Sequence, residues 1–467
     1  MAMSVETRAE PPRPQEPGGL SPACLWLGLS CAALTIAIGF PGSLGIDSQQ
    51  QLQAALEHRF YAWHPPAMVA LWIVFNAVIV GPFLMLTLQA GAWWLGLALI
   101  VRRGFPSSPA LQVASLLAFG LFPPCFGHVA HISKDAQMMT VLVLGVGVLI
   151  DSEARRKRWP LWLGVALLLY GSSVRYNGLA AVLPFVLWIP LRLGSGPLGT
   201  FSASGRRFAA AGSALLLLGG GFAINTLLLP RGAGETPLTQ TIFYDLVGIS
   251  SRTGRNLLPD PQGAPARSAT AIDELYASGW AKIFADGRNR IALQPPHSER
   301  ARQLWRSALL TSPGTYLRHR LYTFGIATGL IDGPKAYVTI PWSWKRVELF
   351  YPSHGLEVRS GRSPLSKLVR VWLGWTVEHF PIMFRSWPYL LLGGLLLAGS
   401  ALQRLRSAPI PVPNRALLLL SSAWLYSGTY LVAGGQPNLR FHLWSVAACA
   451  IALLLLLREL RTPRREA

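Results

Sequence analysis

Acidic and basic side chains lie directly beside long apolar runs of this 467-residue chain. Asp47 follows the first apolar run, and the segment FGHVAHISKDAQ places Lys134 and Asp135 just before another. The segments SSVRYNGL and GGQPNLRFHLW carry further polar residues between apolar runs: Arg175, Asn177 and Arg440. Ionisable groups near a bilayer are costly to keep, so they mark functional sites more often than elsewhere.

A carboxylate and several cations at one membrane surface suit the transfer of a sugar from a lipid phosphate. The acceptor hydroxyl loses a proton as it attacks the anomeric carbon, so a carboxylate serves as general base. Positive side chains stabilise the departing phosphate. We predict Asp47 as the base and Asp135 as a second catalytic carboxylate that orients the base or the acceptor. The residues predicted to bind the substrate are His64, His131, Lys134, Arg175, Asn177 and Arg440.

Several of these residues also have a purely structural interpretation. Asp47 could cap the helix predicted over SQQQLQAALEH, and Asp135 could cap the helix that follows it or pair with Lys134. His64 could simply order the turn at WHPP. Asp245, which lies between apolar residues in TIFYDLVGIS, is either a buried cap or an acceptor contact.

The elements that position these residues are predicted to be membrane-spanning helices. Hydrophobic residues make up 51% of the chain and charged residues only 13%, whereas soluble domains carry roughly 25% charged residues. Several apolar runs reach the roughly 20 residues needed to cross a bilayer. The predicted fold class is an all-α polytopic membrane protein with about ten transmembrane helices. They are expected near residues 22–40, 83–101, 109–126, 136–150, 160–174, 178–191, 208–229, 387–403, 416–433 and 441–457.

Basic clusters fix the predicted orientation, because Lys and Arg favour the cytoplasmic side of a membrane. We interpret 65–80 as a half-inserted juxtamembrane helix of the first outer loop, since clusters such as RRKR and RELRTPRREA then all face inward. Both termini are then cytoplasmic. The predicted parts are a disordered cytoplasmic tail (1–21), an N-terminal transmembrane module (22–229) with a catalytic first loop (41–82), a mostly helical periplasmic segment between spans 7 and 8 (230–386), C-terminal transmembrane helices (387–457) and a basic cytoplasmic tail (458–467).

The remaining composition argues against several classes of partner and cofactor. The net charge of +21 fits basic loops that hold topology and meet anionic lipids, so we expect no nucleic-acid partner. The four cysteines lack metal or redox spacing, so no disulfide framework or structural zinc is expected. His128 and His131 share a helical face, but no third ligand accompanies them. We expect no cofactor, and no divalent metal is indicated.

Four short motifs resemble the GT-C superfamily of integral-membrane glycosyltransferases, which includes the protein O-mannosyltransferases and the transferase that adds aminoarabinose to lipid A. The stretch PGSLGIDSQQQLQA, followed by WHPPAM, resembles the first outer loop of the family, where an Asp after span 1 precedes a His-Pro-Pro motif. ISKD resembles the second acidic position, and RYNG and PNLRF resemble basic motifs of bacterial members. Here Asp47 is followed by Ser48 instead of a second acid, which argues against a tightly bound metal.

The resemblance implies an inverting glycosyltransferase of the bacterial inner membrane that acts on the periplasmic face. Its partners would be a polyprenyl-phosphate-linked sugar donor, membrane lipids, and a lipid, glycan or protein acceptor. Three alternatives stay open: a transporter or flippase for lipid-linked glycans, a glycan polymerase or ligase that uses a lipid-diphosphate donor, and a structural membrane scaffold. A transporter would favour polar or broken helices at the membrane midplane, whereas the acidic residues here lie at the ends of spans.

Overall fold

The computed structural model describes residues 22–105, 108–152, 159–186, 189, 203–230, 236–259, 265–279, 283, 297–333, 347–351, 354–361, 363–406, 414–434 and 436–461. The described chain is mostly helical and contains two short two-stranded sheets. The tail predicted at 1–21, most of the second half of the predicted span 178–191 and the end of the basic tail, 462–467, lie outside the described residues.

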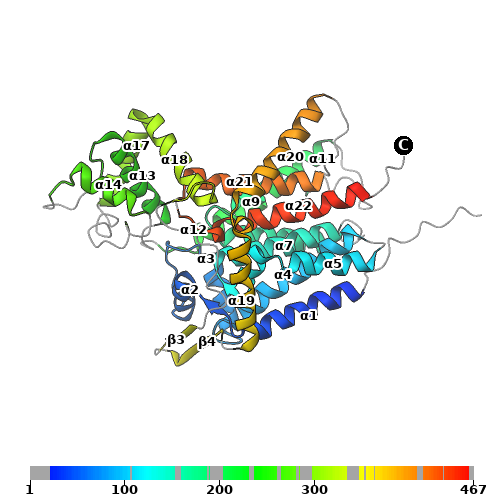
Figure 1. The fold of residues 1–467 in the computed structure, drawn as a ribbon. Helices are drawn as coiled ribbons and strands as arrows, with labels where there is room; N and C mark the ends of the chain where they lie inside the picture. The colour runs from blue at the N-terminus through cyan, green and yellow to red at the C-terminus, as the bar shows by residue number, and fades with distance from the viewer. Residues whose placement is uncertain are drawn as a thin grey trace, which may run out of the picture.

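A bundle of helices makes up most of the molecule (Figure 1). Its helices are α1 (Pro22–Gly39), α4 (Phe83–Gly104), α5 (Pro109–Gly120), α6 (Pro123–Val129), α7 (Lys134–Ser152), α8 (Trp159–Ser173), α9 (Leu179–Val182), α11 (Ala203–Ala214), α12 (Gly220–Leu227), α20 (Trp387–Leu405), α21 (Asn414–Val432) and α22 (Leu443–Arg461). Helix α7 is buried along almost its whole length and packs against α4, α8 and α22. Glycine permits the closest of these approaches: a Cβ on Gly96 would lie 2.7 Å from the backbone nitrogen of Leu144.

Four helical stretches are long and apolar enough to cross a membrane: Pro22–Gly39, Phe83–Gly104, Lys134–Ser152 and Leu439–Leu457. A fifth candidate is the pair α5 and α6, which is bent by 71°. The predicted number of about ten spans is therefore not confirmed. Helix α8 has only 15 residues, and a π-helical turn, η1 (Leu215–Gly219), separates α11 from α12. Helices of this length fall short of the roughly 20 residues that a straight span requires.

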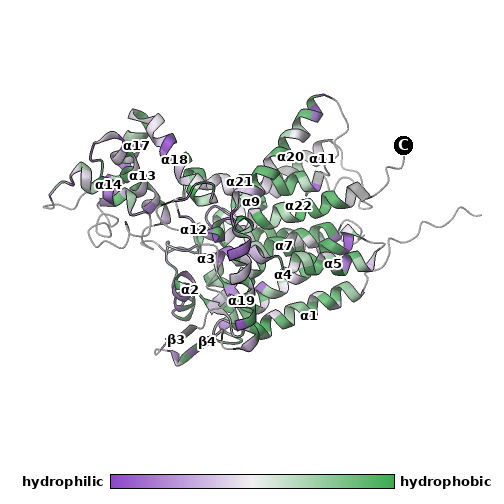
Figure 2. Ribbon diagram, viewed as in Figure 1, coloured by the Kyte–Doolittle hydropathy of each residue, from purple (hydrophilic) through white to green (hydrophobic). Residues whose placement is uncertain are grey.

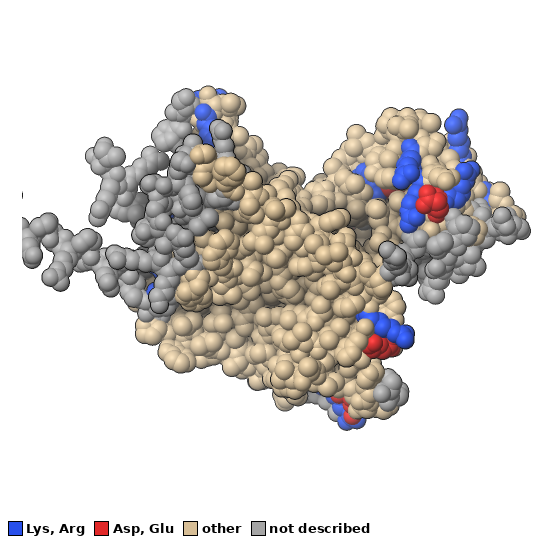
Figure 3. Space-filling view, turned by 180° about the vertical axis from the view of Figure 1, so that it is seen from behind, with Lys and Arg blue, Asp and Glu red and all other residues tan. Residues whose placement is uncertain are grey.

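The distribution of polar residues over the bundle matches these apolar helices. Hydrophobic residues predominate along α1, α4, α7 and α22, whereas hydrophilic residues gather at the ends of the bundle (Figure 2). Seen from behind, the middle of the bundle presents a broad surface without Lys, Arg, Asp or Glu among the described residues (Figure 3). An uncharged belt between charged ends is the surface that a lipid bilayer requires.

The first loop folds back over one end of the bundle and is tied to the loop before α7. Gly42 has a positive φ of 122° and turns the chain into strand β1 (Ser43–Leu44). This strand pairs in parallel with β2 (His131–Ile132), so that Ser43 lies opposite His131. Two further helices of the loop follow, α2 (Ile46–Leu56) and α3 (Pro66–Asn76). A short apolar helix, α3, therefore lies within the segment 65–80, where a half-inserted helix was predicted.

A second group of helices lies at the same end of the molecule, beside the bundle (Figure 1). It consists of α13 (Pro237–Thr253), α14 (Ala269–Ala277), α17 (His297–Thr311) and α18 (Pro313–Thr328). These helices have their own cluster of buried apolar residues around Phe243 and Leu246, separate from the main core. We call them the outer helices. Within the described residues they agree with the mostly helical segment predicted at 230–386.

Between the outer helices and α20 the chain forms a hairpin and a helix that crosses the bundle. Strand β3 (Val347–Tyr351) pairs antiparallel with β4 (Leu356–Ser360). Helix α19 (Pro364–His379) follows, runs across the direction of α1 and contacts it (Figure 1). A 3-10 turn, η4 (Pro381–Phe384), leads from α19 to α20.

Candidate functional site

Asp47 lies in the first turn of α2 and faces two cations from other parts of the chain. The N-cap of α2 is Gly45, so Asp47 is not the cap that the structural interpretation suggested. Its Oδ2 atom lies 3.6 Å from Nζ of Lys134 and 3.3 Å from an Nη of Arg440. The side chain of Asp47 keeps 26% exposure. Asp47 is therefore ion-paired yet reachable from outside.

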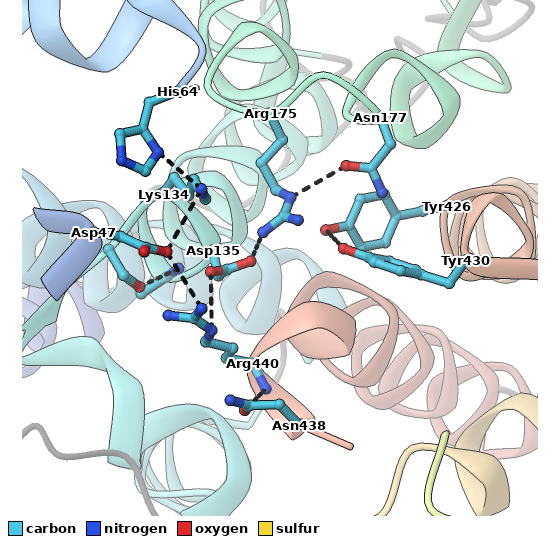
Figure 4. A network of polar contacts seen from close by, with 12 residues as sticks. Asp47, His64, Lys134, Asp135, Arg175, Asn177, Tyr426, Tyr430, Asn438 and Arg440 are labelled. Carbon is cyan, nitrogen blue, oxygen red and sulfur yellow. Dashed lines mark hydrogen bonds and ion pairs between the residues drawn. The ribbon is translucent and has the colours of Figure 1, made fainter. Parts of the chain in front are cut away.

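Asp135 lies beside Asp47 and shares one of its cations, Arg440 (Figure 4). It stands in the first turn of α7, where Ser133 caps the helix by accepting a hydrogen bond from the backbone N–H of Ala136. Its carboxylate is fully buried and forms an ion pair with Arg175. Nε of Arg440 lies 3.9 Å from its Oδ2 atom. One guanidinium, that of Arg440, thus stands between the two carboxylates that were predicted to be catalytic.

Arg175 is held by aromatic and amide side chains as well as by Asp135. Its Nε donates to Oδ1 of Asn177 over 3.1 Å, and Nδ2 of Asn177 donates to the hydroxyl of Thr429 on α21 over 2.8 Å. The guanidinium lies 5.4 Å from the ring centre of Phe441 and 6.0 Å from that of Tyr430. Such cation–π contacts are favourable, and more so when water is excluded. Arg175 is therefore fixed on two sides by residues that come late in the chain.

His64 joins the first loop to Lys134. Its Nδ1 lies 3.1 Å from Nζ of Lys134, and its Nε2 lies 3.0 Å from Oε1 of Gln50. The turn that carries His64 is fastened by Tyr176, whose hydroxyl donates to the carbonyl of Ala62 over 2.7 Å. The motif RYNG therefore contributes Tyr176 in addition to the predicted Arg175 and Asn177.

The charged residues border a cavity of about 530 Å³ at the end of the bundle. Its charged lining comprises Asp47, Lys134, Arg175 and Arg440. One wall is the first turn of α13, from Thr236 to Thr241, so the outer helices face the bundle across the cavity. Aromatic and amide side chains complete the lining: Trp63, Tyr176, Tyr430, Phe441, Asn177, Gln240 and Gln436. A mostly apolar cavity with a few convergent polar groups is the usual form of a ligand site.

Electrostatics in the cavity favour the charged form of Asp47 and the neutral form of His64. Burial raises the pKa of Asp47, but the cations Lys134 and Arg440 outweigh burial and hold that pKa well below its ordinary value. Burial, together with Lys134, lowers the pKa of His64 to about 3. At neutral pH the site therefore contains an ionised carboxylate beside a neutral imidazole.

His131 lies near the site but does not contact the predicted phosphate-binding side chains directly. It belongs to β2 and is buried, and its ring lies 3.1 Å from where a Cβ on Gly45 would stand. Burial and Arg440 lower its pKa to about 4. Within the described ranges no group of three or more His, Cys, Asp or Glu is placed to hold a metal ion.

The structure brings together residues that lie up to 393 positions apart, from Asp47 to Arg440. Asp47, His64, Lys134, Asp135, Arg175, Asn177 and Arg440 form one connected network, in which Tyr426 and Tyr430 are neighbours (Figure 4). Sequence reasoning missed Gln50 and the aromatic lining. The aromatic residues could have been sought next to the polar motifs, because Tyr176 and Phe441 are each adjacent to a predicted arginine.

The fold and the site define a helical protein with apolar helices of membrane-spanning length and a charged cavity at one end of the bundle. No family model, curated protein or solved structure matches this chain. The resemblance to GT-C glycosyltransferases rests on the four motifs, all of which contribute residues to the network around the cavity.

Proposed function

We propose that this protein is a membrane glycosyltransferase that moves a sugar from a polyprenyl-phosphate donor to an acceptor of the cell envelope, with inversion at the anomeric carbon. The proposal includes the predicted topology, with about ten spans, both termini in the cytoplasm and the cavity on the periplasmic face of a bacterial inner membrane. It agrees with the resemblance to the GT-C superfamily.

The observation that carries the proposal is the position of Arg440 between two carboxylates at the edge of the cavity. At pH 7 the site contains three cations, Lys134, Arg175 and Arg440, against two carboxylates, Asp47 and Asp135, which leaves one positive charge in excess. Burial lowers the pKa of Lys134 to about 8, so its ammonium form predominates at that pH. A phosphodiester carries one negative charge, so a single lipid-phosphate sugar would balance the site. Cations placed at a developing negative charge are a strong source of catalysis.

Each charged side chain of the site has a role in the proposed transfer. The acceptor hydroxyl attacks the anomeric carbon and gives its proton to Asp47, while the bond from that carbon to the phosphate oxygen breaks on the opposite side. The bonding electrons remain on the phosphate, which becomes a lipid phosphate with an additional negative charge. Lys134, Arg175 and Arg440 stabilise that charge. Asp135 holds Arg175 and Arg440 in place.

The weak basicity of Asp47 in the ligand-free protein also has an explanation in this scheme. Lys134 and Arg440 both contact Oδ2 of Asp47 and favour its charged form. A donor phosphate beside these same cations offsets their effect, because opposite charges nearby favour ionisation and like charges oppose it. Asp47 therefore becomes the stronger base when the donor is bound.

Turnover of a panel of polyprenyl-phosphate sugars tests the proposal. The purified full-length protein, in lipid nanodiscs that contain envelope lipids, is expected to release polyprenyl phosphate from at least one donor. Asp47→Asn should lower that rate by about 10²–10⁴-fold, the usual contribution of a general base. Glu57→Gln is the matched control, since Glu57 lies at the end of the same helix and its carboxylate accepts a hydrogen bond from Gln53. A folded Asp47→Asn protein with full activity would exclude Asp47 as the base.

A further inference from the structure

A chain of three contacts leads from Gln50 to Asp47, although both residues belong to α2. Oε1 of Gln50 lies 3.0 Å from Nε2 of His64, and Nδ1 of His64 lies 3.1 Å from Nζ of Lys134. Lys134 in turn lies 3.6 Å from Oδ2 of Asp47. The reaction outlined above uses Lys134 and Asp47 but assigns no role to Gln50.

While Lys134 is charged, as it mostly is below its lowered pKa of about 8, these groups allow only one arrangement of protons. A lysine ammonium has three N–H donors and no acceptor, so Nδ1 of His64 must accept from Lys134. The proton of the neutral ring is then on Nε2, which donates to the amide oxygen of Gln50. With Nε2 protonated, the NH₂ group of Gln50 could not take the place of its oxygen, because two donors would face each other.

We propose that Gln50 is a positioning residue that fixes the Nε2–H tautomer of His64, so that Nδ1 holds the Lys134 ammonium beside Asp47, where the leaving phosphate binds. The inference rests on the proposed function, since it assigns Lys134 to the phosphate. A hydrogen bond to one ring nitrogen of a histidine that sets its tautomer is a known way to orient the group on the other nitrogen.

The surroundings of His64 support a fixed, neutral ring. The side chain is 6% exposed, and its backbone carbonyl and that of Ala62 face the hydroxyl of Tyr176. Three cations lower the pKa of the ring: Lys134 on α7, Arg175 just after α8, and Arg440 just before α22. Asp47 on α2 has the opposite effect. The cations disfavour an imidazolium, so the lone pair of Nδ1 stays available to Lys134.

Two variants of Gln50 separate this role from simple packing. In Gln50→Leu, Nε2–H loses its acceptor, so the Nδ1–H tautomer becomes populated and releases Lys134. In Gln50→Glu, the new carboxylate accepts from Nε2–H but also stabilises the imidazolium, whose Nδ1 would donate and repel Lys134 as the pH falls. Gln53→Leu and Gln53→Glu are matched controls, because Gln53 lies on the same helix, is exposed and donates its hydrogen bond to Glu57.

The first measurement is the tautomer of His64, read from ¹⁵N spectra of histidine-labelled full-length protein, with His64→Asn used to assign the signal. The expected signal is that of a neutral ring with an unprotonated Nδ1, and it should shift toward the Nδ1–H form in Gln50→Leu. An Nδ1–H tautomer or an imidazolium in the unsubstituted protein would overturn the inference. This result does not depend on any transferase activity.

The second measurement is the affinity for undecaprenyl phosphate in nanodiscs between about pH 6 and pH 8. Gln50→Leu should bind about tenfold more weakly at both pH values, the effect of one charge-assisted hydrogen bond. Gln50→Glu should weaken mainly at the lower pH, and the Gln53 variants should bind as the unsubstituted protein does. Equal affinity in all variants would overturn the proposed role of Gln50 but leave the proposed function in place. Absence of binding by the unsubstituted protein would instead overturn the proposed function.

Discussion

Two buried groups of charges in this protein differ in what surrounds them. The first is the cavity network around Asp47 and Asp135. The second lies among the outer helices, where Asp245 of α13 is fully buried and pairs with Arg320 at 2.5 Å and with His319 at 3.2 Å. Trp305 donates to the same carboxylate over 2.8 Å.

The Asp245 group is balanced and closed, whereas the cavity network is neither. In the Asp245 group one carboxylate faces one arginine. Burial lowers the pKa of His319, which favours a neutral ring. Arg320 also donates to the carbonyl of Gly434 over 3.0 Å, so the group ties the outer helices to the segment after α21. The cavity network has an excess cation and borders about 530 Å³ of open volume. Buried charge alone therefore does not indicate a ligand-binding site. Excess positive charge beside a cavity is the better indication of one.

The largest expected effect concerns the stability of the Asp245 group. Asp245→Asn leaves Arg320 buried without its counter-charge, so the free energy of unfolding should fall by about 3–5 kcal/mol. Thermal unfolding and limited proteolysis of the outer helices measure this loss. Asp273→Asn is the control, since Asp273 is an exposed residue of α14.

A double variant tests whether the Asp245 group is only structural. Asp245→Asn combined with Arg320→Met removes both charges and should recover part of the lost stability, because replacing a whole buried pair is often neutral. The folded double variant should keep its rate of sugar transfer. A double variant that is stable but inactive would show that Asp245 belongs to the reaction and would end the contrast between the two groups.

The position of the site residues was predictable, because it follows from where apolar runs end. Asp47, Asp135, Arg175 and Arg440 all stand at such ends, and in a protein that crosses a membrane such ends are expected to lie at one level. The short pairing of β1 with β2 was not predictable, since it joins residues 43–44 to residues 131–132 and no local pattern encodes it. Gln50 was not predictable either, because its proposed role depends on the ring of His64, 14 positions away.

The helical class was likewise predictable from composition, whereas the number of spans was not. Apolar content marks α1, α4, α7 and α22 clearly. Hydropathy could not indicate the bend of 71° between α5 and α6, or the π-helical turn η1, because both depend on backbone geometry within a run that remains apolar. Asp245 lies within α13 and does not cap it, so the interpretation as a cap was wrong. Its partners could not be predicted, because they come from α17 and α18, far along the chain.

A smaller effect is expected where the cavity network depends on the shape of one cation. Arg440 reaches Asp47 and Asp135 through different nitrogens, which a lysine ammonium cannot do. Arg440→Lys should lower kcat/KM by about ten- to hundredfold, as one charge-assisted hydrogen bond of about 1.5–3 kcal/mol is lost. Steady-state transfer rates measure the loss. Arg385→Lys is the control, because Arg385 pairs with the exposed Asp332 away from the cavity. Equal losses in both variants would mean that the shape of the cation at Arg440 has no special role in the reaction.

The smallest effect is a difference between two pH profiles of the unsubstituted protein. In the ligand-free protein the pKa of Asp47 is lowered, so Asp47 stays ionised down to about pH 4 and its contribution to stability is lost only as the pH falls further, through that lowered pKa. Accordingly kcat/KM, which reports the free protein, should show no acid limb from Asp47 between about pH 5 and pH 8.

In the donor complex the phosphate offsets Lys134 and Arg440, so burial becomes the dominant influence and raises the pKa of Asp47. The profile of kcat, which reports the complex, should therefore fall at a higher pH than that of kcat/KM. Asp245 and Arg320 do not line the cavity themselves, and Arg320 touches its wall only through the backbone carbonyl of Gly434. The separation should therefore persist in the Asp245→Asn, Arg320→Met double variant. Two profiles that fall together would mean that the donor phosphate does not bind beside Lys134 and Arg440, and the excess positive charge of the cavity would then need another anion to explain it.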